Sequence, residues 1–383
     1  MNKTVFYWGP FIDRNVATKK AIFNSAKAVN QYSKKYFAKI INAVGEWSHE
    51  EVKENKELFY NTNVNFFESL PKYGFFKSRV SFFLIFFLSW FNLKKILREE
   101  KPTFLIIHLI VSLPMLLFFF NDFKTKLILR ISGKPKLNFI RLTFWKFMNK
   151  KINKVFCPTE ETKNLLINLK IFDNNKIFIL SDPVFELKDF VKKKNEIIEK
   201  QNFKNNNFIL IGRLTNQKNF DLIIEACTKI NYELGNHVIY ILGDGELHNK
   251  LESKIKTYQL QNKIILLGKV DNVYKYLFNS KAFILTSLWE DPGFVVVEAA
   301  LNNTPIIASN CKSGPSEILE NGKGGLLFKN NDLNSIVDKI LFFLRDDKNN
   351  IKMRSVYAKK NIRKFSFFRH YINLIKLLDQ TSL

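Results

Sequence analysis

Apolar stretches and helical patterns alternate along the first half of the chain. Residues 4–8 and 39–44 have the continuous apolar character of buried strands, and residues 16–31 between them place apolar side chains at helical spacing. Strand, helix, strand is the beginning of a parallel α/β unit. Further buried strands are predicted at residues 104–109, 125–131 and 155–158, and a helix is predicted to follow Thr159.

The same alternation becomes more regular in the second half of the chain. Buried strands recur there at short intervals, each followed by a helical pattern such as the one over residues 294–301. This regular alternation predicts a second doubly wound domain with a parallel sheet. The predicted strands are residues 207–211, 237–242, 263–267, 282–287, 305–309 and 325–328.

A polar and charged segment, residues 188–206, lies between the two halves and shows no strand pattern. We predict that it is a linker between an N-terminal domain, residues 1–187, and a C-terminal domain, residues 207–363. Residues 364–383 contain a last helix that follows Ser366 and needs a surface for its apolar stripe. The stripe consists of Tyr371, Leu374, Ile375 and Leu378.

Two apolar stretches were tested as membrane spans, which need about 20 residues. Residues 81–91 are too short. Residues 103–120 are long enough, but they contain His108 and Pro114, so we predict a strand, a loop and a helix that begins at Pro114. The apolar stretch in the first ten residues is too short for a secretory signal, and we expect a cytoplasmic protein.

The basic, Phe-rich segment 72–101 has two interpretations. It is either a helix that rests on an anionic membrane surface, at the inner face of the cell membrane, or a buried helix with a solvated basic flank.

Net charge and cysteine content change this picture little. The chain carries 60 Lys and Arg against 35 Asp and Glu, a net charge of +25, together with 39 Phe. This mixture is typical of an AT-rich genome, and the Lys residues are scattered, so we expect no nucleic-acid partner. The three cysteines, Cys157, Cys227 and Cys311, have no metal-binding spacing and are predicted to be buried free thiols.

Candidate phosphate ligands follow the first strand of the second half. Gly212 and Arg213 come directly after that strand, and Lys218 follows shortly before a helix. Two cations beside a helix N-terminus suit diphosphate oxygens. The alternative for this segment is a solvated basic turn.

A second candidate segment contains two carboxylates around a helix start. Glu290 lies in a loop after a strand, and Glu298 lies roughly 7 Å along the helix that starts near Gly293. A nucleotide sugar carries hydroxyls on both sides of its diphosphate, so one helix can hold phosphate at its tip and hydroxyls at the two carboxylates. Asp291, Pro292, Phe294 and Val295 complete the segment.

Three further turns lie at strand ends. Gly243 and Gly245 form either a tight turn or part of a ligand site, and Gly268 and Val270 are candidates for contact with a nucleotide base. Residues 313–317 are either a third helix start facing the same ligand or an ordinary one.

The ordered set GRL…K, GDGEL, LGKV, SLWEDPGFVVVEAA, TPIIASNCKSGPSEIL and GGLLF resembles family 4 glycosyltransferases over residues 205–330. The resemblance implies the GT-B fold, with two Rossmann-like domains facing a cleft and a C-terminal helix that crosses back to the N-domain. It implies retaining transfer from a nucleoside diphosphate sugar to a glycan or lipid-linked acceptor in surface polysaccharide or glycolipid synthesis, without a metal or other cofactor.

The resemblance also implies roles for single residues. Arg213 and Lys218 would hold the diphosphate, Glu298 the ribose and Glu290 the transferred sugar. In the first half, Gly9 resembles the glycine of the loop after the first strand of the family's N-domain. His108 resembles the family's histidine near the sugar. The alternative for His108 is a core histidine whose hydrogen bonds are satisfied. Candidates on the acceptor side are Asp13, Arg130, Ser132 and Gly133.

The sequence leaves two other functions open. A nucleotide-sugar epimerase or hydrolase would use the same fold, and a basic nucleic-acid-binding protein would explain the charge.

Overall fold

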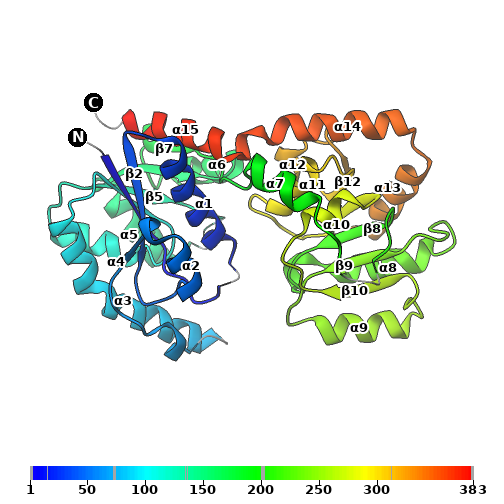
Figure 1. The fold of residues 1–383 in the computed structure, drawn as a ribbon, viewed down its shortest axis with the longest axis horizontal. Coiled ribbons are helices and arrows are strands. Elements are labelled where there is room, and N and C mark those ends of the chain that lie inside the picture. The colour runs from blue at the N-terminus through cyan, green and yellow to red at the C-terminus, as the bar shows by residue number, and fades with distance from the viewer. Residues whose placement is uncertain are drawn as a thin grey trace. The chain divides into compact units, whose positions relative to one another are not determined.

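The computed structural model describes residues 3–14, 16–71, 75–133, 135, 137–199, 203–311 and 313–380. The chain forms two compact units, one of Met1–Pro183 with Phe367–Leu383 and one of Val184–Ser366. Figure 1 shows a sheet with packed helices in each unit. We call them unit 1 and unit 2.

Unit 1 is built on a parallel sheet with the strand order β3-β2-β1-β4-β5-β6-β7. The order reverses at β1, which pairs with β2 through Lys3 and Tyr36 and with β4 through Val5 and Phe104. Right-handed crossovers in the two directions place helices on both faces of such a sheet. The strands are β1 (Lys3–Trp8), β2 (Tyr36–Asn42), β3 (Phe59–Asn61), β4 (Phe104–Ile107), β5 (Lys126–Arg130), β6 (Ile152–Cys157) and β7 (Ile177–Ile179).

The helices of unit 1 connect these strands, with one addition from the end of the chain. They are α1 (Ala17–Tyr32), α2 (His49–Glu54), α3 (Phe75–Glu99), α4 (Ser112–Phe120), α5 (Phe139–Met148), α6 (Glu160–Asn168) and α15 (Phe367–Asp379). Thr159 caps α6 by accepting a hydrogen bond from the Thr162 N–H, as the sequence predicts.

Unit 2 repeats the design with the strand order β10-β9-β8-β11-β12-β13, again all parallel. Its strands are β8 (Phe208–Ile211), β9 (Ile239–Leu242), β10 (Ile264–Gly268), β11 (Ala282–Leu285), β12 (Ile306–Ser309) and β13 (Leu326–Phe328). Its helices are α7 (Leu187–Lys194), α8 (Phe220–Ile230), α9 (His248–Thr257), α10 (Tyr274–Phe278), α11 (Phe294–Leu301), α12 (Pro315–Ile318), α13 (Leu333–Arg345) and α14 (Lys348–Asn361).

The predicted strands are confirmed because their apolar runs are buried on both faces, as in a parallel sheet. Segment 188–206 differs from the expected linker. Residues 187–194 form α7, which buries Phe190 in the core of unit 2 and whose Lys193 carbonyl accepts a hydrogen bond from Asn272. Residues 200–202 of that segment lie outside the described residues.

The apolar residues 81–91 belong to α3, which has 25 residues and continues past Lys94 and Lys95. By length and composition alone, its residues Phe76–Glu99 are sufficient to cross a membrane, and a third of its most apolar window is buried in the protein. The uninterrupted apolar run of residues 81–91 is much shorter than this helix, because the helix also includes the charged residues on both sides of the run. Residues 72–74 of the basic segment lie outside the described part of the chain.

Helix α15 packs against α1 in unit 1. It buries Leu374 and Leu378, as the stripe predicts, together with Phe367 and His370. Tyr371 and Ile375 are only half-buried. The His370 ring links the Ser181 carbonyl, 2.7 Å from Nδ1, to the Ser25 hydroxyl, 2.7 Å from Nε2.

We expect His370 to make stability depend on pH. Burial lowers its pKa from 6.5 to about 4. Below pH 6.5 the unfolded chain therefore binds a proton that the folded chain does not. The free energy of unfolding should be highest above this pH and fall as pH drops toward 4, by at most about 1.4 kcal/mol per pH unit. Between pH 7 and pH 5, the melting temperature of the wild type should fall further than that of His370→Gln. Equal falls would contradict this role.

Candidate functional site

The loops at the carboxyl ends of β8, β9 and β10 are joined to one another by main-chain hydrogen bonds. The Gly212 N–H donates to the Leu242 carbonyl at 3.0 Å, and the Leu214 N–H donates to the Asp244 carbonyl at 3.0 Å. The Gly243 N–H donates to the Gly268 carbonyl at 2.9 Å. These bonds fix the backbone on which the candidate phosphate ligands are placed.

Gly243 and Gly245 are required by the close approach of two backbones. A Cβ atom on Gly243 would lie 1.8 Å from the Gly212 carbonyl oxygen, and one on Gly245 would lie 2.6 Å from the Leu214 carbonyl oxygen. Gly212 in turn lies under the Lys218 side chain, whose carbons are 3.1 Å from where its Cβ would be. Because these three predicted positions are glycines, the turns can approach one another and the Lys218 side chain can lie against the end of β8.

Lys218 and Glu290 form an ion pair through Nζ and Oε1, and the two side chains are 15% and 6% exposed. The Ser287 hydroxyl donates to the same Glu290 oxygen at 2.6 Å. The charge of the candidate phosphate ligand Lys218 is thus neutralised by Glu290, the candidate sugar ligand. Arg213 is exposed in the loop after β8. Ser287 opens the SLWEDPGF segment but is not among the predicted site residues.

The start of α11 lies next to this pair. Gly293 is its N-cap with a φ of +87°, a conformation that favours glycine, and its Cβ position lies 3.3 Å from the Glu290 side chain. A Cβ on Gly314 would lie 2.1 Å from the Pro292 carbonyl oxygen, so the loop after β12 packs on residues 290–293. The Val296 N–H donates to the Gly293 carbonyl at 3.0 Å, and the N–H groups before it in the first turn of a helix have no helical partner and suit an anion.

Glu298 is buried in unit 2 and Val270 is partly buried. Glu298 is 8% exposed on α11, and together with burial its charge raises the pKa of Tyr274. Val270 packs against the hydrophobic core of unit 2. Gly268 has a φ of +74° and no atom within 4 Å of its Cβ position. Asp291, Phe294 and Val295 belong to the same turn and helix start.

In unit 1, the ends of β1 and β4 bring Gly9 and His108 together. A Cβ on Gly9 would lie 3.2 Å from His108 Cβ and 2.3 Å from Ile22 Cδ1. The His108 ring is buried, and neither of its nitrogens has a hydrogen-bond partner among the described residues. Burial, with Arg130 and His370 nearby, lowers the pKa of His108 well below its usual range, so the ring is neutral.

Arg130 ends β5 and forms a buried ion pair with Asp182, with 2.6 Å between Nη2 and Oδ1. Its Nη1 atom and the Ser132 hydroxyl are buried without a hydrogen-bond partner in the part of the chain that the structure describes. His108, Arg130, Ser132 and Gly133 line one cavity of about 990 Å³. Asp13 is exposed and is not among the described residues that line this cavity. Sequence inspection missed Asp182, although it follows a strand end.

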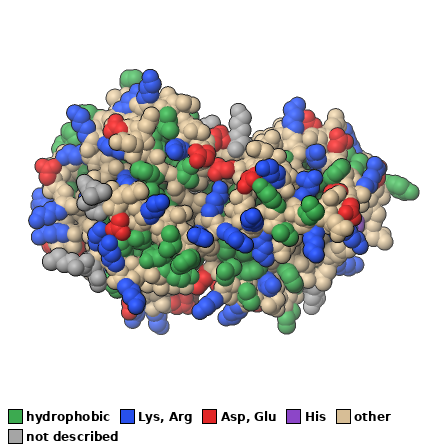
Figure 2. Space-filling model, turned by 90° about the horizontal axis from the view of Figure 1, so that it is seen from above, with side chains coloured by type: hydrophobic (Ala, Val, Ile, Leu, Met, Phe, Trp, Pro, Cys, Tyr) green, Lys and Arg blue, Asp and Glu red, His purple; other side chains and the backbone are tan. Residues whose placement is uncertain are grey.

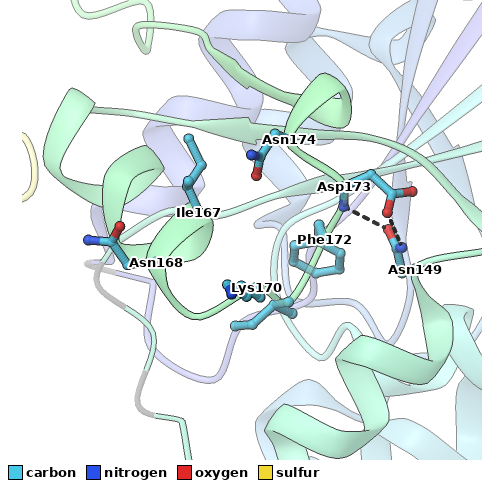
Figure 3. A pocket seen from close by; sticks show the side chains of 8 residues that line it. Asn149, Ile167, Asn168, Lys170, Phe172, Asp173 and Asn174 are labelled. Carbon is cyan, nitrogen blue, oxygen red and sulfur yellow. Dashed lines mark hydrogen bonds between the residues drawn. The ribbon is translucent and has the colours of Figure 1, made fainter.

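A second pocket in unit 1 lies at the other edge of the sheet (Figure 3), before β6 and β7. It has a volume of about 570 Å³, and two of its polar residues are hydrogen-bonded to each other. Asn149 Nδ2 donates to Asp173 Oδ1 at 2.9 Å, and the Asp173 N–H donates to Asn149 Oδ1 at 3.3 Å. Ligands of parallel sheets bind at the carboxyl ends, so this pocket is the weaker candidate.

The described residues contain no group of three His, Cys, Asp or Glu side chains placed to hold a metal ion. Cys157, Cys227 and Cys311 are buried free thiols, as predicted.

Comparison with known proteins identifies the family. The family model for glycosyl transferases group 1 matches residues 191–364. An uncharacterized glycosyltransferase of Methanocaldococcus jannaschii is 31% identical over 309 residues, which cover 76% of this chain and 73% of the relative. The chain is a group 1 glycosyltransferase.

A second relative is the UDP-Gal:alpha-D-GlcNAc-diphosphoundecaprenol alpha-1,3-galactosyltransferase of Escherichia coli. It is 30% identical to this glycosyltransferase over 221 residues, which cover 56% of this chain and 57% of the relative. This chain thus spans less than two thirds of that relative.

The solved structure of a glycosyltransferase from Rickettsia africae ESF-5 aligns with a TM-score of 0.79 at 17% identity, covering 100% of this chain and 99% of that one. This likeness shows the fold, which is GT-B. The comparisons give no support to the epimerase, hydrolase or nucleic-acid alternatives. On the face drawn in Figure 2, Lys and Arg are scattered over both units.

The glycine positions allow a stability test. Gly268→Ala places a side chain at a positive φ in open space and should cost about 1–2 kcal/mol. Gly243→Ala adds the clash with the Gly212 carbonyl and should lower the free energy of unfolding by roughly 2 kcal/mol more, because backbone must move. Urea unfolding of the full chain measures both. Equal losses in the two variants would show that the loops do not need this close approach.

Proposed function

We propose that this glycosyltransferase binds a nucleoside diphosphate sugar at the carboxyl edge of the unit 2 sheet. It transfers the sugar, with retention of configuration, to a glycan or lipid-linked acceptor bound by unit 1. The observation that carries the donor assignment is the Lys218–Glu290 pair beside the free N–H groups of α11. A cation, a carboxylate and a helix N-terminus match the diphosphate and hydroxyls of such a donor.

The ion pair gives the donor a way to organise its own site. A bound diphosphate attracts Lys218 away from Glu290, because each offers the ammonium group a negative oxygen. Glu290 is then available to accept hydrogen bonds from hydroxyls of the transferred sugar, while Ser287 holds its position. Glu298 is assigned to the ribose hydroxyls, and Arg213 to the second phosphate.

The chemical step exchanges one bond to the anomeric carbon for another. The bond from this carbon to the diphosphate oxygen breaks, and the acceptor oxygen bonds to the same face. The acceptor proton passes to the leaving diphosphate. Negative charge grows on the diphosphate as it leaves, so Arg213, Lys218 and the α11 N–H groups stabilise the transition state more than the ground state. We expect these groups to act without a metal ion.

We also propose a cytoplasmic location at the inner face of the membrane. There a water-soluble nucleotide sugar and a membrane-held acceptor are both within reach of the enzyme. The named activity of the Escherichia coli relative joins these two substrate classes.

Nucleotide binding tests the donor site. In thermal-shift titrations of the full chain with UDP, GDP, ADP and CDP, one nucleotide should raise the melting temperature, with and without EDTA. Lys218→Ala and Arg213→Ala should each weaken that nucleotide about tenfold, because a hydrogen bond to a charged group contributes about 1.5–3 kcal/mol.

Lys256→Ala is the matched control. Lys256 lies in the last turn of α9, is exposed and pairs with Glu252. It should bind the nucleotide as the wild type does. Wild-type binding in both site variants would refute the donor site.

A further inference from the structure

Residues 287–290, which follow β11 in unit 2, lie outside the helices and strands, and we call them the Glu290 loop. Each of the four backbone carbonyls of this loop accepts a hydrogen bond from a side chain. About two-thirds of protein hydrogen bonds join backbone to backbone, so four successive carbonyls bonded in this way are a high concentration. The donors are Gln217, Ser309, Cys311, Ser313 and Asn330.

Two side chains from the end of β12 and the loop after it hold the beginning of the Glu290 loop. The Ser309 hydroxyl donates to the Ser287 carbonyl at 2.6 Å, and the Cys311 thiol donates to the same oxygen at 3.0 Å. A carbonyl oxygen has two lone pairs and accepts both. Ser287, Ser309 and Cys311 are all buried, and hydrogen bonds are stronger in the low dielectric of the protein interior.

The end of the Glu290 loop is held by the same loop after β12. The Ser313 hydroxyl donates to the Glu290 carbonyl at 2.5 Å. The Cβ position of Gly314, the next residue, is 3.3 Å from the Cβ atom of Glu290. The first and last residues of the Glu290 loop are therefore both fixed to one neighbouring segment of the chain.

The middle of the Glu290 loop is held by other segments. Asn330 Nδ2 donates to the Leu288 carbonyl at 2.7 Å, and Gln217 Nε2 donates to the Trp289 carbonyl at 2.9 Å. Neither Leu288 nor Trp289 carries a side chain of the proposed donor site, and Trp289 is 55% exposed. The bonds to the first and last residues, rather than those in the middle, therefore bear on the donor site.

Ser287 and Glu290 carry the side chains whose relative position matters for a ligand. The Ser287 hydroxyl donates to Glu290 Oε1 at 2.6 Å, and the same oxygen pairs with Lys218. When a bound diphosphate attracts Lys218, as proposed above, Ser287 is the side chain that still holds the carboxylate. The direction of the carboxylate then depends on the backbone of residues 287 and 290. A ligand group that is already held in position binds more tightly because less ordering is needed.

We infer that Ser309, Cys311 and Ser313 are positioning residues of this transferase. They hold the backbone of Ser287 and Glu290, so that the Glu290 carboxylate faces the hydroxyls of the transferred sugar when Lys218 binds the diphosphate. They act through Glu290 and do not touch the donor. The inference rests on the proposed function and gives the loop after β12 a role in sugar recognition.

The test compares the binding of a nucleotide with that of its sugar derivatives, by isothermal titration calorimetry of the full chain. The probes are UDP, GDP, ADP and CDP, followed by the glucose, galactose and mannose derivatives of the nucleotide that binds. The measured quantity is the dissociation constant of the tightest nucleotide sugar divided by that of its nucleotide, which we call the sugar ratio. A change that only destabilises the fold moves both constants together and leaves the sugar ratio unchanged.

Ser313→Ala should raise the sugar ratio about fivefold, because the sugar depends on the position of Glu290 and the diphosphate does not. The dissociation constant of the nucleotide should change by less than about twofold. Ser309→Ala with Cys311→Ala should have the same effect, since it removes both donors to the Ser287 carbonyl. Ser309→Ala with Cys311→Ser keeps one hydroxyl donor and should restore a ratio near that of the wild type. Should the double alanine variant fail to fold, Ser313→Ala alone decides.

Asn330→Ala is the matched control. It removes a hydrogen bond of the same kind from the same loop, but from the Leu288 carbonyl. Its sugar ratio should equal that of the wild type. An equal rise in Asn330→Ala and Ser313→Ala would overturn the inference, because any loosening of the Glu290 loop would then have the same effect.

Glu290→Gln measures the sugar contact itself and separates the inference from the proposed function. A sugar ratio that rises in Glu290→Gln but not in Ser313→Ala overturns the inference and leaves the sugar contact in place. A ratio that stays unchanged in both refutes the assignment of Glu290 to the sugar, and the inference with it. If none of the four nucleotides binds, the donor site itself is refuted.

Discussion

Parallel strands that are buried on both faces satisfy their peptide groups with one another, so the sheets themselves have few polar groups to offer a ligand. In both units the remaining polar chemistry collects in the loops at the carboxyl edge. Unit 2 holds these loops by hydrogen bonds between the turns after β8, β9 and β10, and it needs Gly243 to let the turns approach. The position of Lys218, and through it that of Glu290, depends on this contact.

The carboxyl edges of the two sheets differ in how their polar side chains are hydrogen-bonded. In unit 2, Lys218, Glu290 and Ser287 bind one another, so a ligand of Lys218 or Glu290 must exchange one partner for another. In unit 1, Arg130 pairs with Asp182 through one nitrogen, and His108 has no hydrogen-bond partner within the described ranges. A cavity with unpaired groups of this kind gains hydrogen bonds when a hydroxyl-bearing ligand enters. The polar side chains are thus paired with one another at the carboxyl edge of unit 2 and only partly paired at that of unit 1.

Sequence reasoning placed the strands well because buried parallel strands are continuous apolar runs bounded by turns. It also singled out Gly243, Lys218 and Glu290 because they lie in loops after strands, and the structure shows that Lys218 and Glu290 form an ion pair. It could not find the Arg130–Asp182 pair, whose members lie 52 positions apart and meet only through the sheet order. The helical pattern of α7 was not recognised because its few apolar residues, such as Phe190, are surrounded in the sequence by lysines. The length of α3 was missed because a helix continues through Lys94 and Lys95, whereas an apolar run does not.

The hydrogen bond between Ser25 and His370 spans 345 positions of the chain, and it has a consequence for synthesis. Unit 1 begins to emerge from the ribosome first, but α1 cannot pack against α15 until unit 2 has been translated. Unit 2 is continuous from Val184 to Ser366 and is able to fold on emergence. The order of completion is therefore the reverse of the order of translation, and α1 keeps an uncovered apolar face during the interval.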